Sequence, residues 1–436
     1  MNMQDVIDYL YKIPRFSRTG GLSMTRKRLE LLGNPEKTFK YVHVAGTNGK
    51  GSVCAYVEQG IRDLGFKTGL FTSPHLVKIN ERIQIGRENI SDTAFMCAFD
   101  RVKKLVDAQA AEGIAHPTFF EFIFLMAMTA FAEAHIEYGI IETGLGGRLD
   151  LTNAVENPAL TVITSIGLDH TEVLGATIEE IAGEKAGIIK PDTPLVYLDE
   201  KAAAASVLRK KAANVESIPV KPEWMVNIGT SGGQIHFSLR CPYFQKYDII
   251  LNTNAVYQIE NSSLAVTVLE TLRKRFPEEF CLTYEEFHKS VSESMEKMYW
   301  PGRMESIADG IYVDGAHNDD GILRLTQTLR SSFKDKQILL VFAVAEDKDY
   351  QQMVKHLCTL TNIKQIFVTE IGNTRRRDYH EVMDGFRKNT HVNIQGTYNV
   401  NEAIKAAVQL KTTEDVLICT GSLYLVGDVK KILGGI

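Results

Sequence analysis

No stretch of this sequence is apolar over the roughly 20 residues that a membrane-spanning helix needs. The most apolar run, Ile338 to Val344, has only the length of a strand. The first residues, Met1 to Val6, show neither the basic segment nor the apolar segment of a secretory signal. We therefore expect a cytoplasmic protein that has no membrane segment.

Paired cysteines and an excess of basic charge are also missing. The six cysteines form no CxxC pair, which argues against a disulfide framework and against a zinc site. We expect all six to be reduced, buried thiols: Cys54, Cys97, Cys241, Cys281, Cys358 and Cys419. The formal net charge of −5 supplies no basic field for nucleic acid, so any anion-binding surface must be local.

Length and pattern predict two α/β domains. A chain of 436 residues exceeds one ordinary core. Segments of strand and helix character alternate along it, which is typical of a mostly parallel sheet covered by helices. The main strands are predicted at 41–45, 67–72, 138–141, 160–166, 311–313, 338–343, 366–369 and 416–419, and short antiparallel strands at 224–226 and 234–239. Pro301 and Gly302 interrupt the helical pattern, so we place the domains at 1–297 and 298–436.

The clearest chemical signal is a glycine-rich loop between a predicted strand and a predicted helix. Its residues are Gly46, Thr47, Asn48, Gly49, Lys50, Gly51 and Ser52. The glycines let backbone N–H groups approach phosphate oxygens, the helix N-terminus favours anions, and Lys50 can reach the terminal phosphates of ATP. Gly51 separates Lys50 from Ser52, unlike in the common P-loop. An ordinary glycine-rich turn is the alternative, but a lysine in this context favours a nucleotide site.

Three polar residues follow predicted strands, at the edge where open α/β sheets bind their ligands. They are Ser73, Glu142 and His170. ATP is used together with magnesium, which prefers hard oxygen ligands, so Glu142 is the first candidate ligand and Ser73 the second. A histidine is less usual for magnesium, and His170 alone would more often be structural. Its place at a strand end beside Asp169 favours a functional role.

The second half of the chain has a similar arrangement around Asp314. The segment 314–318 follows a predicted strand, and Asn318 or Asp319 can cap the next helix, although a plain strand–turn–helix junction is the alternative. Arg303 can meet a phosphate if the two domains close on ATP. Lys185, by contrast, has the pattern of a helix lysine whose charge is solvated.

Ten segments together resemble the folylpolyglutamate synthase and dihydrofolate synthase family, a branch of the Mur ligase superfamily. They occur in the family order over nearly the whole chain, which makes the combined match highly specific. The segments are 46–52, 72–76, 80–83, 142–150 with 152–153, 168–170, 184–190, 300–303, 314–318, 347–349 and 420–424.

The resemblance implies an ATPase domain and a smaller C-terminal Rossmann-like domain, with ATP and both substrates in the cleft between them. It implies that Ser73, Glu142 and His170 bind magnesium, that Lys185 carries a carbamate as an anionic metal ligand, and that a monovalent cation can be present. Lys50, Glu142, His170 and Lys185 are the predicted catalytic residues. Residues that resemble ATP contacts are Asn261, Arg303, Asp314 and His317, and those that resemble positions near the pterin substrate are Thr118, Phe120, Leu149, Asp150 and Leu151.

The implied activity is an ATP-dependent ligation of L-glutamate to a folate-type carboxylate. A carboxylate is a poor electrophile, and transfer of the γ-phosphate of ATP converts it into a reactive acyl phosphate. The acceptor stays open between a reduced folate, dihydropteroate or both. Relatives with the segment 147–150 of this sequence often use both.

Two other functions compete with this prediction. A Mur-type amino-acid ligase of cell-wall synthesis shares the loop and the chemistry, but only 45 residues precede Gly46, too few for the nucleotide-sugar domain of those enzymes. A regulatory module without catalysis is disfavoured because Lys50, Glu142, His170 and Asp314 are all present. We expect a monomer whose partners are small molecules, not nucleic acid or membranes.

Overall fold

The largest sheet of the protein carries the glycine-rich loop. The structure is a computed structural model that describes residues 2–14, 20–372 and 375–434, and its strands form three sheets there. The largest has the order β4-β3-β2-β5-β1-β6-β7-β8 and is parallel from β2 to β8, with β3 and β4 as an antiparallel edge. Its strands are β1 (Lys40–Ala45), β2 (Thr68–Phe71), β3 (Ile83–Ile85), β4 (Glu88–Asn89), β5 (Tyr138–Glu142), β6 (Leu160–Ile163), β7 (Leu195–Leu198) and β8 (Ser217–Val220).

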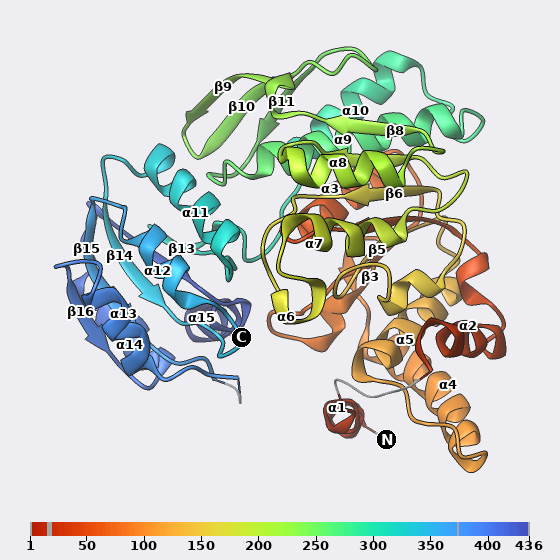
Figure 1. Cartoon of the computed structure of the whole chain (residues 1–436), viewed down its shortest axis with the longest axis horizontal. Coiled ribbons are helices and arrows are strands. Elements are labelled where there is room, and N and C mark those ends of the chain that lie inside the picture. The colour runs from red at the N-terminus through yellow and green to blue at the C-terminus, as the bar shows by residue number, and fades with distance from the viewer. Residues whose placement is uncertain (1, 15–19, 373–374, 435–436) are drawn as a thin grey trace.

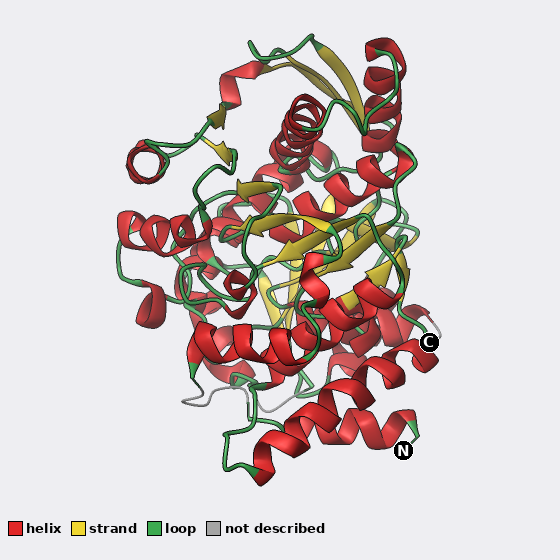
Figure 2. Ribbon diagram, turned by 90° about the vertical axis from the view of Figure 1, so that its right-hand side faces the viewer, coloured by secondary structure: helices red, strands yellow, loops and turns green. Residues whose placement is uncertain are grey.

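Helices cover both faces of this sheet, because successive side chains of a strand point to opposite faces. Val42 and Val44 of β1 belong to a core with α3 and α9, whereas Tyr41 and Ile141 belong to another core with α4 and α5. Figure 2 shows the strands enclosed by helices. The helices of this part are α1 (Met3–Lys12), α2 (Gly21–Leu31), α3 (Lys50–Asp63), α4 (Asp92–Ala111), α5 (Phe119–Glu133), α6 (Thr171–Leu174), α7 (Ile178–Lys185), α8 (Ala202–Lys211), α9 (Gln258–Arg275) and α10 (Tyr284–Lys297).

A small antiparallel sheet and a C-terminal sheet complete the fold. The small sheet has the order β11-β10-β9, with β9 (Met225–Ser231), β10 (Gln234–Leu239) and β11 (Tyr247–Leu251). The C-terminal sheet has the order β12-β13-β17-β14-β15-β16 and is parallel except for β12. Its strands are β12 (Glu305–Ala308), β13 (Ile311–Val313), β14 (Gln337–Phe342), β15 (Ile363–Val368), β16 (Asn393–Gly396) and β17 (Asp415–Thr420).

The C-terminal sheet and its helices lie beside the larger N-terminal part, as the blue elements in Figure 1 show. Its helices are α11 (Asp319–Ser332), α12 (Tyr350–Leu357), α13 (Tyr379–Arg387), α14 (Val400–Leu410) and α15 (Leu423–Gly434). The predicted α/β fold with a second, Rossmann-like part is confirmed. We propose that the domain boundary lies after residue 297, because α10 ends there and β12 already belongs to the C-terminal sheet.

The sequence predicted the central strands of both large sheets but missed strands at sheet edges and one strand inside the largest sheet. All the predicted strands are present, whereas β3, β4, β7, β8, β11, β12 and β16 and the two helices before β1 were not predicted. The expectation of six buried thiols was wrong, because Cys97 and Cys281 are exposed and Cys358 is half-buried. None of the helices in the described ranges has the length and apolarity to cross a membrane.

Candidate active site

A cavity of about 1060 Å³ lies between the two parts, at the carboxyl ends of strands from both large sheets. Every residue predicted for a nucleotide, metal or substrate role lines it. These are Asn48, Gly49, Lys50, Gly51, Ser52, Ser73, Thr118, Phe120, Glu142, Leu149, Asp150, Leu151, His170, Lys185, Asn261, Arg303, Asp314 and His317. Residues far apart in the sequence thus share one site, as the topology of parallel sheets favours.

The glycine-rich loop joins β1 to the N-terminus of α3, as predicted. Gly49 has a φ of +84°, and a Cβ atom there would lie 2.4 Å from Asn261 Oδ1, so this position requires glycine. Thr164 donates a hydrogen bond of 2.7 Å to the Asn48 carbonyl, and Lys50 Nζ donates one of 3.2 Å to the Thr47 carbonyl. The loop backbone is therefore fixed by its neighbours, and the Lys50 ammonium lies over the turn where phosphates would bind.

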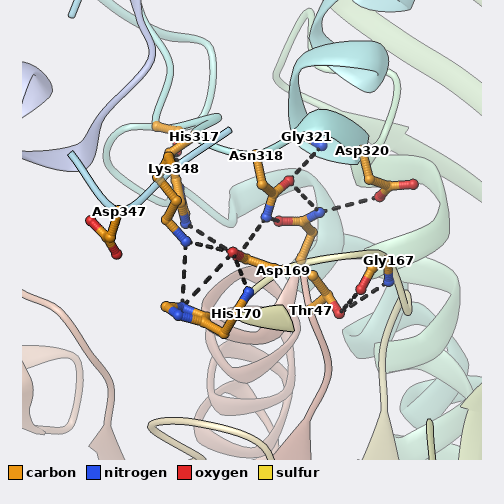
Figure 3. Close-up of polar contacts among 12 residues, drawn as sticks. Thr47, Gly167, Asp169, His170, His317, Asn318, Asp320, Gly321, Asp347 and Lys348 are labelled. Atoms are coloured by element: carbon orange, nitrogen blue, oxygen red, sulfur yellow. Dashed lines mark hydrogen bonds and ion pairs between the residues drawn. The ribbon is translucent and has the colours of Figure 1, made fainter. Parts of the chain in front are cut away.

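The side chain of Asn48 is held by the C-terminal part of the molecule. Asn48 Nδ2 donates to Asn318 Oδ1 at 3.1 Å and to Asp320 Oδ2 at 3.2 Å, and Asn48 Oδ1 accepts from Asn318 Nδ2 at 3.1 Å. Asn318 also caps α11 by accepting from the Gly321 N–H at 2.8 Å. Figure 3 shows Asn318, Asp320 and Gly321 at the start of α11, with the hydrogen bond between Asn318 and Gly321. The first turn of α11 and the loop therefore orient each other.

Glu142 is a buried carboxyl group at the end of β5. Its Oε2 accepts a 2.9 Å hydrogen bond from the Ser73 N–H. Burial raises the pKa of Glu142 above its ordinary value, although Lys50 and the Ser73 N–H oppose the shift. A bound cation would offset the cost of burying this carboxylate, so the donor set fits a magnesium ion. Among the described residues no group of three or more acidic, histidine or cysteine side chains is arranged to hold a metal ion. A magnesium ion held by Ser73, Glu142 and His170 would complete its ligand set with phosphate and water oxygens.

Asp169 joins the loop after β6 to the C-terminal part (Figure 3). It accepts hydrogen bonds from Lys348 Nζ at 2.5 Å and from Asn318 Nδ2 at 2.9 Å, and His170 and His317 lie within 4.0 Å of it. Burial alone would raise the pKa of Asp169, but Lys348 and the two histidines outweigh it and lower the pKa. Burial and Lys348 lower the pKa of His317 to about 4, so its ring is neutral at pH 7.

Lys185 is not the solvated lysine that its local pattern suggested. Its residue is 3% exposed, and its Nζ donates a 2.8 Å hydrogen bond to the Gly46 carbonyl. Burial and the charge of Lys50 lower the pKa of Lys185 to about 7, although Asp169 and Asp150 oppose the shift. A large fraction of this amine is therefore uncharged near neutral pH, in contact with the phosphate loop.

Asp314 and Arg303 contribute from the C-terminal part. Asp314 Oδ2 accepts from the Tyr257 hydroxyl at 2.5 Å and from the Met304 N–H at 2.9 Å, and its Oδ1 accepts from the Ala316 N–H at 2.9 Å. Burial raises the pKa of Asp314, and the Arg303 guanidinium opposes this shift. Asp314 thus fixes the turn after β13, and Arg303 lines the cavity beside it.

The predicted acceptor residues form one wall of the cavity. Thr118 caps α5 by accepting from the Glu121 N–H at 3.2 Å, and the Phe120 ring lies 5.7 Å from that of Phe71. Asp150 accepts from the Leu145 N–H at 2.7 Å and from the Thr152 hydroxyl at 2.6 Å. Leu149 is 65% exposed, so it lies at the rim. An aromatic ring and aliphatic side chains around a polar turn suit a flat, partly polar ligand.

We expect Glu142→Gln to lower the turnover of the expected ATP-dependent ligation about a hundredfold, because an amide replaces the anionic oxygen that a magnesium ion prefers. The measurement is the initial rate over a series of magnesium concentrations. Glu112→Gln, at an exposed position after α4, is the control and should keep wild-type rates. A Glu142→Gln protein with a wild-type magnesium response would remove this residue from the metal site.

This fold and site define a two-part P-loop protein of the Mur ligase class. The model of the Mur ligase middle domain matches residues 44–269, and that of the Mur ligase glutamate ligase domain matches residues 302–423. Both matched ranges contain residues that line the cavity.

The relatives narrow this class to one family. The chain is 34% identical to a dihydrofolate synthase/folylpolyglutamate synthase of Bacillus subtilis, over 99% of each chain, and 30% identical to a folylpolyglutamate synthase of Lacticaseibacillus casei, over 100% of each. Its fold matches a Mycobacterium tuberculosis folylpolyglutamate synthase complexed with ADP and AMPPCP, with a TM-score of 0.87 at 27% identity over 99% and 98% of the chains. The fold also matches that of an FPGS-AMPPCP-folate complex, with a TM-score of 0.85 at 30% identity over 99% of this chain and 100% of the other. The chain belongs to the folylpolyglutamate synthase and dihydrofolate synthase family.

The individual roles of Tyr257 and Lys348 were not predicted. Tyr257 has no sequence signal, since only the fold brings it to Asp314, 57 residues away. Lys348 lies in the segment 347–349 that supported the family resemblance, and its position after a strand was a usable signal.

Proposed function

We propose that this chain is an ATP-dependent ligase that joins L-glutamate to the carboxylate of a folate-type acceptor. The observation that carries the proposal is the single cavity that combines the phosphate loop, the buried Glu142 and Lys185, and the wall formed by Thr118, Phe120 and residues 149–151. The names of the full-length relatives support the substrate class. No feature of the site favours a cell-wall acceptor over a folate.

The reaction has two steps. An oxygen of the acceptor carboxylate attacks the γ-phosphorus of ATP, so the bond to the β–γ bridging oxygen breaks and ADP leaves. Lys50 and the N–H groups of the loop neutralise the charge that develops on the phosphate. The α-amine of glutamate then attacks the acyl carbon, and phosphate leaves with one oxygen of the original carboxylate.

Water must be kept out while the acyl phosphate exists, because such anhydrides hydrolyse readily. Residues of both parts line the cavity, and Asp169 bridges the two parts through Lys348 and Asn318. We propose that the reaction takes place with the two parts held together by these contacts. One chain supplies every residue of the site, so we also propose that the enzyme acts as a monomer.

Magnesium bound through Ser73, Glu142 and His170 would supply positive charge to the phosphates. We propose that Lys185 carries a carbamate there. Carbamate formation requires an uncharged amine, and the lowered pKa of Lys185, about 7, provides one near neutral pH. The further monovalent cation stays a prediction with no assigned ligands.

The acceptor is tested by supplying ATP, magnesium, glutamate and either dihydropteroate or tetrahydrofolate in parallel. We expect phosphate release and an amide product of the corresponding mass for at least one of the two. A nucleotide-sugar carboxylate of cell-wall synthesis serves as the control acceptor and should give no product. Product from that control alone would overturn the folate assignment.

A further inference from the structure

We propose that Arg324 is a positioning residue that sets the phosphate loop for ATP by fixing the C-terminal part on the N-terminal part. It acts within a cluster of five charged side chains, here called the Arg324 cluster: Glu200, Lys201, Glu260, Asp320 and Arg324. The inference rests on the proposed function only in taking ATP as the nucleotide.

Arg324 lies on α11 and reaches two carboxylates of the other part. Its Nη1 donates to Glu260 Oε2 on α9 at 2.6 Å, and its Nη2 donates to Glu200 Oε2 in the loop after β7. The three side chains are only 11–20% exposed. Charged groups so far removed from water interact more strongly than surface pairs, and the planar guanidinium can hold both carboxylates at once.

Asp320 extends the cluster to the phosphate loop. Lys201 Nζ donates to Asp320 Oδ1 at 2.7 Å and to the Ile166 carbonyl at 2.8 Å. The other oxygen, Asp320 Oδ2, accepts from Asn48 Nδ2 at 3.2 Å and lies 3.7 Å from Arg324 Nε. Arg324 therefore orients, through one shared carboxylate, an asparagine of the glycine-rich loop.

The packing beneath the cluster leaves this turn of α11 little freedom to shift. A Cβ atom at Gly167 would lie 3.0 Å from Asp320 Cβ, so the loop after β6 and α11 approach as closely as a glycine permits. Thr47 of the phosphate loop exchanges 3.0 Å hydrogen bonds with the Gly167 backbone. Gly167 thus lies close to Asp320 of α11 and is hydrogen-bonded to Thr47 of the phosphate loop, as Figure 3 shows for the second contact.

Arg324 offsets an excess of negative charge in the cluster. The cluster has three carboxylates and two cations, and Glu200 Oε1 is buried without a hydrogen-bond partner. Without Arg324, Glu200 and Glu260 would face each other and Asp320 with only Lys201 as a counter-charge. Their repulsion would push α11 away from the N-terminal part and release Asn48.

The test is Arg324→Met, with binding of a non-hydrolysable ATP analogue measured in the absence of acceptor and glutamate. We expect about tenfold weaker binding, within the usual range for coupled sites, and a higher KM for ATP. Arg324→Gln, which also removes the positive charge but can still donate a hydrogen bond, should weaken binding in the same direction and covers the case that Arg324→Met does not fold. Arg330→Met is the matched control, since Arg330 lies on the same helix and, among the residues that the structure describes, its side chain donates hydrogen bonds to Thr359 of the C-terminal part.

A merely structural role would lower the thermal midpoint of Arg324→Met without changing the affinity for the nucleotide. Nucleotide binding within twofold of wild type by a folded Arg324→Met protein, or by a folded Arg324→Gln protein if the methionine variant does not fold, would therefore overturn the inference. A wild-type chain that binds no nucleotide would instead refute the proposed function.

Discussion

Replacing Lys50 by alanine is expected to lower ligation by at least about a hundredfold while the protein stays folded. The ammonium is the cation of the loop itself, and removing a charge placed where negative charge develops typically costs that much. The Lys50 ammonium donates a hydrogen bond to the Thr47 carbonyl, and losing it costs about 1 kcal/mol of stability. The measurement is product formation together with a thermal unfolding curve.

Lys37→Ala is a suitable control for Lys50→Ala, because Lys37 is exposed and lies outside the cavity. It should leave both the rate and the thermal midpoint unchanged. Wild-type ligation by a folded Lys50→Ala protein would show that the glycine-rich loop does not act on the phosphates of ATP.

The second large effect is expected at Lys185. If it carries a carbamate, Lys185→Ala should lose most of the activity, whereas Lys185→Glu should retain some by placing a carboxylate at similar reach. The carbamate should be visible by ¹³C NMR after addition of labelled bicarbonate, and acid conditions must be avoided because carbamates are labile. Lys190→Ala, at the half-buried end of the same segment, is the control and should remain active.

The ligation activity of the wild type should depend on pH through the ionisation of Lys185. The amine adds carbon dioxide only when uncharged, so with a pKa of about 7 the carbamate should be lost as the pH falls below 7. The remaining activity of Lys185→Glu should not show this loss below pH 7, since no amine titrates at that position. A fully active Lys185→Ala protein, together with no carbamate resonance in the wild type, would refute the modification.

The sequence predicted those parts of the site that depend on neighbouring residues. The run of buried residues in β1, the glycines after it and Lys50 at the start of α3 are contiguous, so local pattern and chemistry were sufficient. Glu142 was found for a similar reason, because a polar residue ends an apolar strand.

Contacts between distant segments could not be predicted in this way. Lys185 is buried because its amine meets the Gly46 carbonyl, 139 residues away, and nothing in its own helix indicates this. Asp169 and Lys348 are 179 residues apart, and only the packing of the two parts places them 2.5 Å from each other. The family resemblance anticipated a role for Lys185, but the physical reason for it, burial beside another cation, required the structure.

The central claim, ligation through an acyl phosphate, is tested most directly by labelling the acceptor carboxylate with ¹⁸O. Attack of that carboxylate on the γ-phosphorus transfers one of its oxygens to phosphate when glutamate displaces it. We therefore predict that the phosphate released during ligation contains one ¹⁸O atom for each amide formed. Amide product accompanied by unlabelled phosphate would contradict the mechanism.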